Sequence, residues 1–210
     1  MNIMTLVNAL PGAAAQGLIW GIMAIGVYLT FRILDVADLT VDGTMCTGGA
    51  VCIMMLMSGH SMFASMIAAT CAGMLAGLAT GIFHTFMGIP AILAGILTQL
   101  GLYSVNLKIM GKANQAVNGN KYNLLVSLRN VKNVPFYQNT ILIVAIFIVV
   151  LIAILYWFFG TELGCSLRST GCNPNMSRAQ GINTDVCKVL GLMISNGLVA
   201  LSSALLAQYQ

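Results

Sequence analysis

The chain has 210 residues, of which 59% are hydrophobic and only 7% are charged, and its mean hydropathy is +0.91. A soluble domain carries roughly 25% charged residues, because its surface must be solvated. This composition argues against a soluble enzyme, a nucleic-acid-binding protein and a disordered chain, and the net charge of +4 comes from basic residues scattered along the sequence. The sequence therefore predicts an integral membrane protein.

Six apolar stretches are long enough, or nearly so, to cross a bilayer core, which takes about 20 residues as a helix. They cover approximately residues 13–31, 41–57, 62–83, 89–110, 140–159 and 186–207. Because lipid satisfies no backbone polar group, these spans must be helices. We predict an all-α polytopic membrane protein with about six transmembrane helices in a single domain over residues 1–210.

Three polar connections separate the spans, at residues 32–42, 111–139 and 160–185, so the first and third should share one side of the membrane. Counting basic residues gives a near tie between the two sides, or slightly favours the middle connection as cytoplasmic. The middle connection carries Lys112, Lys121, Arg129 and Lys132, and the other side carries Arg32, Arg168, Arg178 and Lys188.

The six cysteines are interpreted as small reduced hydrophobic residues. Three of them fall inside apolar stretches, and the spacing of the other three matches no zinc pattern. The apolar set is Cys46, Cys52 and Cys71, and the loop set is Cys165, Cys172 and Cys187.

Small and polar residues recur on one face of several predicted spans. Gly73, Gly77 and Gly81 are four residues apart and predict close helix packing. Gln99, Tyr103 and Asn106 share one face of the fourth span, where polar side chains would not face lipid. They join helices or line an aqueous path, and Ser195 and Asn196 in the last span have the same two interpretations.

Three of the five acidic residues, Asp35, Asp38 and Asp42, lie between the first two spans. A metal cluster is one interpretation, although no histidine accompanies them. A solvated turn in which Asp38 or Thr40 caps the second span is another. A third is a broken helix whose free amides point into a cavity, which the polar and glycine-rich start of the second span favours.

The connection at 160–185 contains Asn173-Pro174 and Gly181, which predict a short helix over about 174–180. A folded connection with Arg168 and Arg178 suggests docking to another protein. The string LRSTGCNPNMSRAQGIN over 167–183 resembles the loop of ABC-importer permeases for branched-chain amino acids and sugars, close to L-R-A-x-G-x-N-P-x-x-A-R-x-x-G-I. Ser169 and Ser177 are mild departures from this pattern.

Three further segments support the resemblance. Residues 38–43 are similar to the family's D-L-S-V-G element, and residues 90–99 and 103–111 look closest to the subgroup of tryptophan or tyrosine importers. The resemblance implies a permease subunit of an importer, multi-pass in the bacterial plasma membrane. It implies four partners: an ABC ATPase, an extracellular or periplasmic solute-binding protein, a second permease copy and membrane lipid.

The chain is not expected to be an enzyme or to hold a metal or cofactor, since it lacks G-x-x-x-x-G-K-[ST] and ATP-Mg would bind the partner ATPase. The resemblance makes the 160–185 connection cytoplasmic, against the charge count, and the short helix a coupling helix. The implied coupling residues are Arg168, Ser169, Gly171, Asn173, Pro174, Arg178 and Gly181.

The predicted substrate pathway is lined by Asp38, Thr40, Asp42, Gln99, Tyr103, Asn106 and Asn196. The expected substrate is an aromatic or branched-chain amino acid or a similar small solute. An aromatic amino acid could stack on Tyr103 while amides near Asp42 receive its carboxylate. The main alternative is a secondary transporter driven by an ion gradient. An intramembrane protease is disfavoured, because His60 and His84 are isolated and no protease motif is present.

The segment at Gly191 matches the segment at Gly17, and both open a span rich in small residues. If the spans form two related halves, Gln210 falls just before the counterpart of the Asp38 element. We therefore expect a two-repeat permease that is cut off within its second half.

Overall fold

The computed structural model describes residues 3–112 and 140–209, and these residues form helices and no strands. The helices are α1 (Ile3–Tyr28), a π-helical turn η1 (Leu29–Ile33), α2 (Val41–Met57), α3 (Met62–Thr85), α4 (Ala91–Met110), α5 (Thr140–Gly160), α6 (Glu162–Cys172), α7 (Pro174–Ala179) and α8 (Thr184–Tyr209). Five of these segments are long and apolar enough to cross a membrane, and α2, with 17 residues, is a shorter apolar helix. The all-α class is confirmed, and each predicted span corresponds to a helix.

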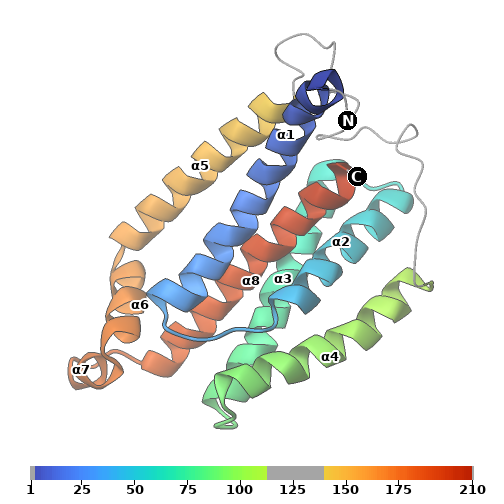
Figure 1. The fold of residues 1–210 in the computed structure, drawn as a ribbon. Coiled ribbons are helices and arrows are strands. Elements are labelled where there is room, and N and C mark those ends of the chain that lie inside the picture. Colours follow the sequence, from blue (N-terminus) through green and yellow to red (C-terminus); the bar gives the residue numbers. More distant parts are fainter. Residues whose placement is uncertain (1–2, 113–139, 210) are drawn as a thin grey trace.

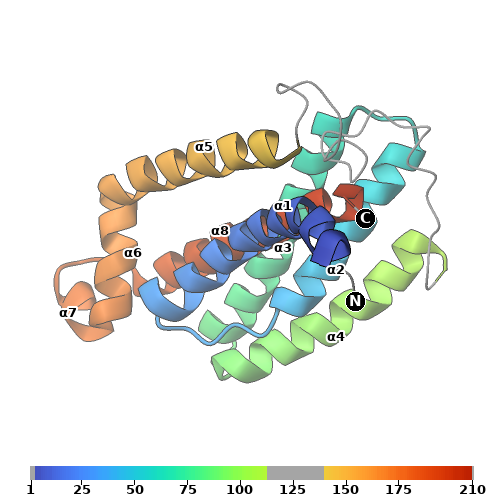
Figure 2. The same cartoon turned by 45° about the horizontal axis from the view of Figure 1, so that its top comes forward.

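The spans form a bundle around α8. Helices α1, α3 and α5 run in one direction, and α2, α4 and α8 run in the other (Figure 1). Helix α8 packs most extensively on α3 and also on α2 and α1. Helices α4 and α5 lie at opposite sides of the bundle, as the turned view also shows (Figure 2). The long central helix therefore contacts the most neighbours, and α4 and α5 are peripheral.

Helix α8 approaches α3 very closely. A Cβ atom added at Gly73 would meet the Asn196 carbonyl, and one added at Gly77 would lie 2.9 Å from the Cα of Met193. Gly81 continues the same contact, with Val189 Cα at 3.0 Å from such an atom. The glycine stripe thus lies directly against the α8 backbone, in the small-residue geometry of membrane helix pairs.

Helix α8 meets α1 along a regular seam of hydrogen bonds. The Ser195 hydroxyl donates to the carbonyl of Gly26, and the Ser202 hydroxyl donates to the carbonyl of Ile19, each at 2.7 Å. One further step of seven residues along both helices, the Tyr209 hydroxyl donates to the carbonyl of Gly12 at 2.7 Å. A seven-residue repeat keeps the same face of each helix in contact over several turns.

The connection between α5 and α8 contains more helix than the sequence suggested. The predicted short helix is present as α7, but α6 was not predicted. Helix α6 contains Gly164 and Gly171, and each lies where the chain makes a close backbone contact. A Cβ at Gly164 would meet the backbone of Phe159, and one at Gly171 would meet the carbonyl of Ile33. These glycines allow α6 to pack tightly, and they do not break it.

All six cysteines are free, with Cys52 and Cys187 buried and the other four exposed. In the part of the chain that the structure describes, no three His, Cys, Asp or Glu side chains gather in a way that could hold a metal ion.

Candidate functional site

Helices α1 and α2 run in opposite directions, and an irregular connection over residues 34–40, called the helix break below, joins them. Helix α1 widens into the π-helical turn η1, which ends with the amide of Leu34 donating to the carbonyl of Leu29, and the amide of Val36 then donates to the carbonyl of Thr30, each at 3.0 Å. Non-helical chain then follows to Thr40, and Asp35 has a positive φ of 53°. π-Helical turns are rare and occur frequently at functional sites. Whether this segment acts as a broken helix with free amides pointing into a cavity stays a prediction.

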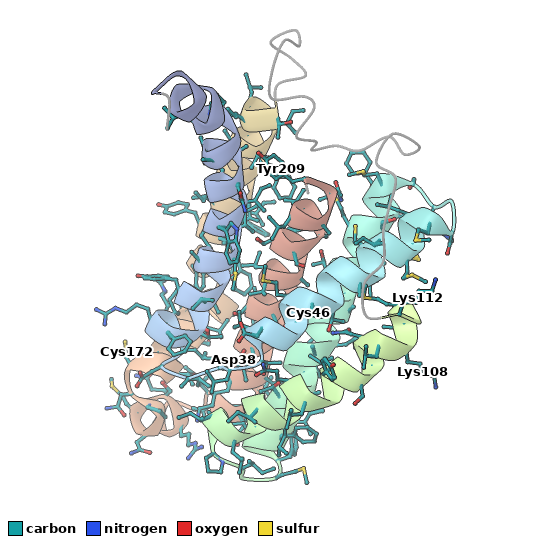
Figure 3. All side chains as sticks on the ribbon, turned by 45° about the vertical axis from the view of Figure 1, so that its right-hand side comes forward. Asp38, Cys46, Lys108, Lys112, Cys172 and Tyr209 are labelled. Carbon is teal, nitrogen blue, oxygen red and sulfur yellow. The ribbon has the colours of Figure 1, made fainter. Side chains whose placement is uncertain are left out.

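Asp38 lies inside the bundle at this break, with 2% of its surface exposed (Figure 3). Its Oδ1 accepts the backbone N–H of Thr40 at 2.8 Å. Its Oδ2 accepts the side-chain amide of Asn196, from the middle of α8, at 2.7 Å. Within the described residues, no basic side chain lies within salt-bridge distance of Asp38. Two N–H donors, one from the break and one from α8, therefore stabilise this buried side chain by hydrogen bonds.

Threonines extend this polar network through the bundle. The Thr44 hydroxyl lies against both Asn196 Oδ1 and the Thr40 carbonyl, so its single proton serves one of two acceptors. The hydroxyls of Thr40 and Thr80 are 2.7 Å apart, and Thr80 donates to the hydroxyl of Thr98 at 3.0 Å. The network thus joins the break, α2, α3, α4 and α8 through buried side chains.

Thr44, Thr80 and Thr98 are not among the residues predicted to line the substrate pathway. All three are buried threonines within apolar helices, and each hydroxyl also lies within hydrogen-bond distance of the carbonyl four residues earlier in its own helix. A signal was present, because a threonine that also faces a neighbouring helix can join two spans. Their partners lie on different helices, so no pattern within one helix selects these three threonines.

The three polar residues of α4 do not converge on Asp38. Asn106 is buried and its Oδ1 has no hydrogen-bond partner, Gln99 is half-buried, and Tyr103 is 66% exposed. Asp42 is also exposed, at the first turn of α2. Asp38, Thr40 and Asn196 are therefore brought together, while Asp42, Gln99, Tyr103 and Asn106 lie outside their network. A role in the substrate pathway stays a prediction for all seven residues predicted to line it.

The α6–α7 unit, residues 162–179, lies at the same end of the bundle as the helix break (Figure 1). This is the arrangement that alternation of the spans predicted for the first and third connections. Helix α4 ends and α5 begins at the other end of the bundle (Figure 1), and residues 113–139, with Lys121, Arg129 and Lys132, lie outside the described residues. Lys112 is exposed at the end of α4.

Three of the predicted coupling residues shape α7. The side chain of Asn173 caps the helix by accepting the amide of Met176 at 3.1 Å, and Pro174 occupies its first position. Gly181 follows the helix with a φ of +83°, a conformation that glycine adopts without strain. The short helix is therefore defined by its own caps.

The two arginines point to different places. The Nε of Arg178 donates to the hydroxyl of Thr184 at 2.8 Å, and its guanidinium lies 3.4 Å from Asp185, so it ties α7 to the start of α8. Arg168 instead reaches back to the last turn of α5, where it donates to the carbonyl of Phe159 at 2.8 Å. Ser169 is half-buried on α6, and its hydroxyl donates to the Ser166 carbonyl.

Helix α6 also packs on the break itself. Gly171 brings the α6 backbone against the carbonyl of Ile33 in η1. Beside this contact, Leu34 and Leu167 pack with Leu192 of α8 in a buried apolar cluster, four residues before Asn196. A displacement of α6 would therefore press on the segment that carries Asp38.

Comparison with known proteins shows which family the chain belongs to. The sequence profile of the branched-chain amino acid transport system permease component matches residues 10–210. The chain belongs to this permease family. It is a multi-pass membrane protein, and the resemblance inferred from the 167–183 loop is confirmed.

Individual relatives agree with the family. The chain is 40% identical over 194 residues to the tyrosine transport system permease protein of Clostridioides difficile, covering 92% of this chain and 62% of the relative. It is 35% identical over 201 residues to an uncharacterised protein of Rickettsia prowazekii, covering 96% and 68%. It is 30% identical over 199 residues to the autoinducer 2 import system permease protein of Yersinia pseudotuberculosis, covering 93% and 53%. The chain thus spans about half to two thirds of the length of these relatives, and no solved structure matches it significantly.

Proposed function

We propose that the chain forms the membrane pathway of an ATP-driven importer for an amino acid, aromatic or branched-chain, or a similar small solute. The family supports transport, and the name of the Clostridioides relative supports an aromatic amino acid. ATP is hydrolysed by a separate ATPase subunit, because the sequence has no phosphate-binding G-x-x-x-x-G-K-[ST] loop. A solute-binding protein delivers the substrate, and the assembly lies in the bacterial plasma membrane with the α6–α7 end in the cytoplasm.

The observation that carries this proposal is the contact between the α6–α7 unit and the helix break. Force applied to α7 by an ATPase passes to α6, and from Gly171 and Leu167 to Ile33 and Leu34. Four residues beyond Leu34, Asp38 is hydrogen-bonded to Asn196 of the central helix. Small shifts at one end of a packed bundle are converted into discrete rearrangements, because packed interfaces are not continuously deformable. In this proposal, the bond between Asp38 and Asn196 is the element that switches.

A second permease copy completes the pathway. Tyr103 is 66% exposed on the outer side of α4, so a path that this residue lines must be closed by another chain. Asn106, one turn further along α4, has a buried carbonyl oxygen without a partner, which a substrate in the pathway could satisfy. The aromatic ring of Tyr103 suits stacking with an aromatic substrate.

The test is uptake of radiolabelled tyrosine and leucine by proteoliposomes that contain the protein with its co-purifying ATPase subunit and binding protein. We expect uptake that requires ATP and is inhibited by vanadate. Asn196→Leu keeps the volume but removes the bond to Asp38, and uptake should fall at least tenfold with the assembly still intact by size-exclusion chromatography. Ile154→Leu, on the exposed side of α5, is the matched control and should transport normally. Uptake that follows a sodium or proton gradient without ATP would instead identify a secondary transporter.

A further inference from the structure

A pocket of about 450 Å³ lies at the corner where α5 ends and α6 begins. Its lining comes entirely from these two helices and their junction: Tyr156, Trp157, Phe159, Gly160, Thr161 and Arg168. The pocket is separate from the Asp38 network and from α7. It combines exposed aromatic rings with one cationic side chain.

The guanidinium of Arg168 is held in place at this pocket. It donates to the carbonyl of Phe159 at 2.8 Å and lies 3.4 Å from the sulfur of Cys165, one turn before it on α6. In the described parts of the chain, no carboxylate lies within 4.0 Å of it, and Glu162, at the first turn of α6, is exposed and does not line the pocket. The remaining N–H groups of Arg168 therefore present an unneutralised positive charge to the pocket.

The residues around the pocket are of the types that are typical of the membrane surface. Helix α5 is the most apolar span, and it ends with Tyr156 and Trp157, which are 84% and 74% exposed. Tyrosine and tryptophan at the end of a span are typical of the level of the lipid headgroups, where their rings are half in hydrocarbon and half in water. Arg168 reaches back to the same level through its bond to Phe159.

We propose that this corner binds the headgroup of an anionic phospholipid. The phosphate accepts hydrogen bonds from Arg168, because a guanidinium matches phosphate oxygens with paired N–H donors. The rings of Tyr156 and Trp157 contact the glycerol region, and the acyl chains follow the exposed side of α5. The bound lipid would fix the angle between α5 and α6, and so the position of the α6–α7 unit. Lipid binding at this site does not depend on the proposed transport function.

The test is the thermal stability of the purified protein, without ATPase, titrated with phosphatidylglycerol or phosphatidylcholine in mixed micelles. We expect stabilisation at lower concentrations of phosphatidylglycerol. Arg168→Gln should weaken the apparent affinity for it by about fivefold, as expected for one basic residue at an anionic surface. Arg178→Gln removes a positive charge from α7, away from the pocket, and is the matched control that should retain the preference.

Further variants keep the test decisive if Arg168→Gln fails to fold. Arg168→Lys retains the charge but not the paired donors, and Trp157→Ala removes a pocket wall; both should weaken the preference for phosphatidylglycerol. Equal effects of the two lipids, or an unchanged preference in all three pocket variants, would overturn the proposal. Equivalent stabilisation by inorganic phosphate would show a free anion site in place of a lipid site, and would also overturn it. Because no ATPase is present, a failed transport proposal leaves the result interpretable.

Discussion

Helices α5 and α8 are both apolar membrane spans, yet they have opposite environments. Of the residues in the most apolar 18-residue stretch of α8, 67% are buried, whereas only 11% are buried in the corresponding stretch of α5. Helix α5 is nevertheless the more apolar of the two. It consists largely of isoleucine, leucine, valine and phenylalanine, while α8 contains Gly191, Gly197 and a series of serines and alanines.

This difference in burial follows from the properties of the lipid bilayer that surrounds membrane spans. Lipid tails are as apolar as leucine, so hydrophobicity does not drive one span against another, and close packing and hydrogen bonds do. Small residues let α8 approach α3, and its polar residues bond to α1 and to the helix break. The large branched side chains of α5 are mostly exposed or half-buried on the outside of the bundle. In this protein, small and polar residues predict burial better than hydropathy does.

The largest expected effect comes from filling the contact between α3 and α8. Gly77→Ala places a methyl group against the backbone of Leu192 and Met193, which cannot move without shifting α8. Overpacking costs about 1–3 kcal/mol and occasionally more, and we expect the upper part of this range. Thermal unfolding in detergent, followed by tryptophan fluorescence, measures the loss.

Gly21→Ala is the matched control, because a Cβ atom there meets nothing within 4 Å. It should be neutral or stabilise the protein slightly, since alanine is the better helix former. Equal destabilisation by both variants would show that the glycines act through backbone flexibility and not through contact with α8.

A smaller effect is expected from truncating large side chains. Leu192→Ala on α8 leaves a cavity in a fully buried site, in the cluster with Leu34 and Leu167. We expect a loss of about 1–3 kcal/mol, below the value in soluble proteins, because the unfolded span stays in lipid and only packing is lost. Ile154→Ala on α5 should cost much less, since this residue is 59% exposed and lipid fills the space. A cost for Ile154→Ala as large as that for Leu192→Ala would mean that another chain covers α5.

The same contrast shows what the sequence could predict. Five of the six spans were predictable within about two residues, because length and hydropathy fix them, whereas α1 begins at Ile3, well before its predicted start at residue 13. Helix α7 was predictable from its own caps, Asn173-Pro174 and Gly181. Helix α6 was not, since Gly164 and Gly171 act as contact points only in three dimensions. Asp38 and Asn196 were each identified as candidates, but their hydrogen bond joins residues 158 positions apart, and no local pattern encodes that distance.

The smallest effect concerns the hydrogen bonds between α8 and α1. Ser202→Ala removes a buried bond to the carbonyl of Ile19, and membrane double-mutant cycles give about 0.6 kcal/mol for such bonds. Ser195→Ala should cost a similar amount, and the two costs should add, because the sites lie seven residues apart and share no partner. Ser58→Ala removes only an exposed bond within α2 and is the control. A loss of stability in the double variant well beyond the sum of the two single losses would mean that the hydrogen bonds between α8 and α1 form cooperatively. Additive losses would mean that close packing, more than hydrogen bonding, holds α8 in the centre of the bundle.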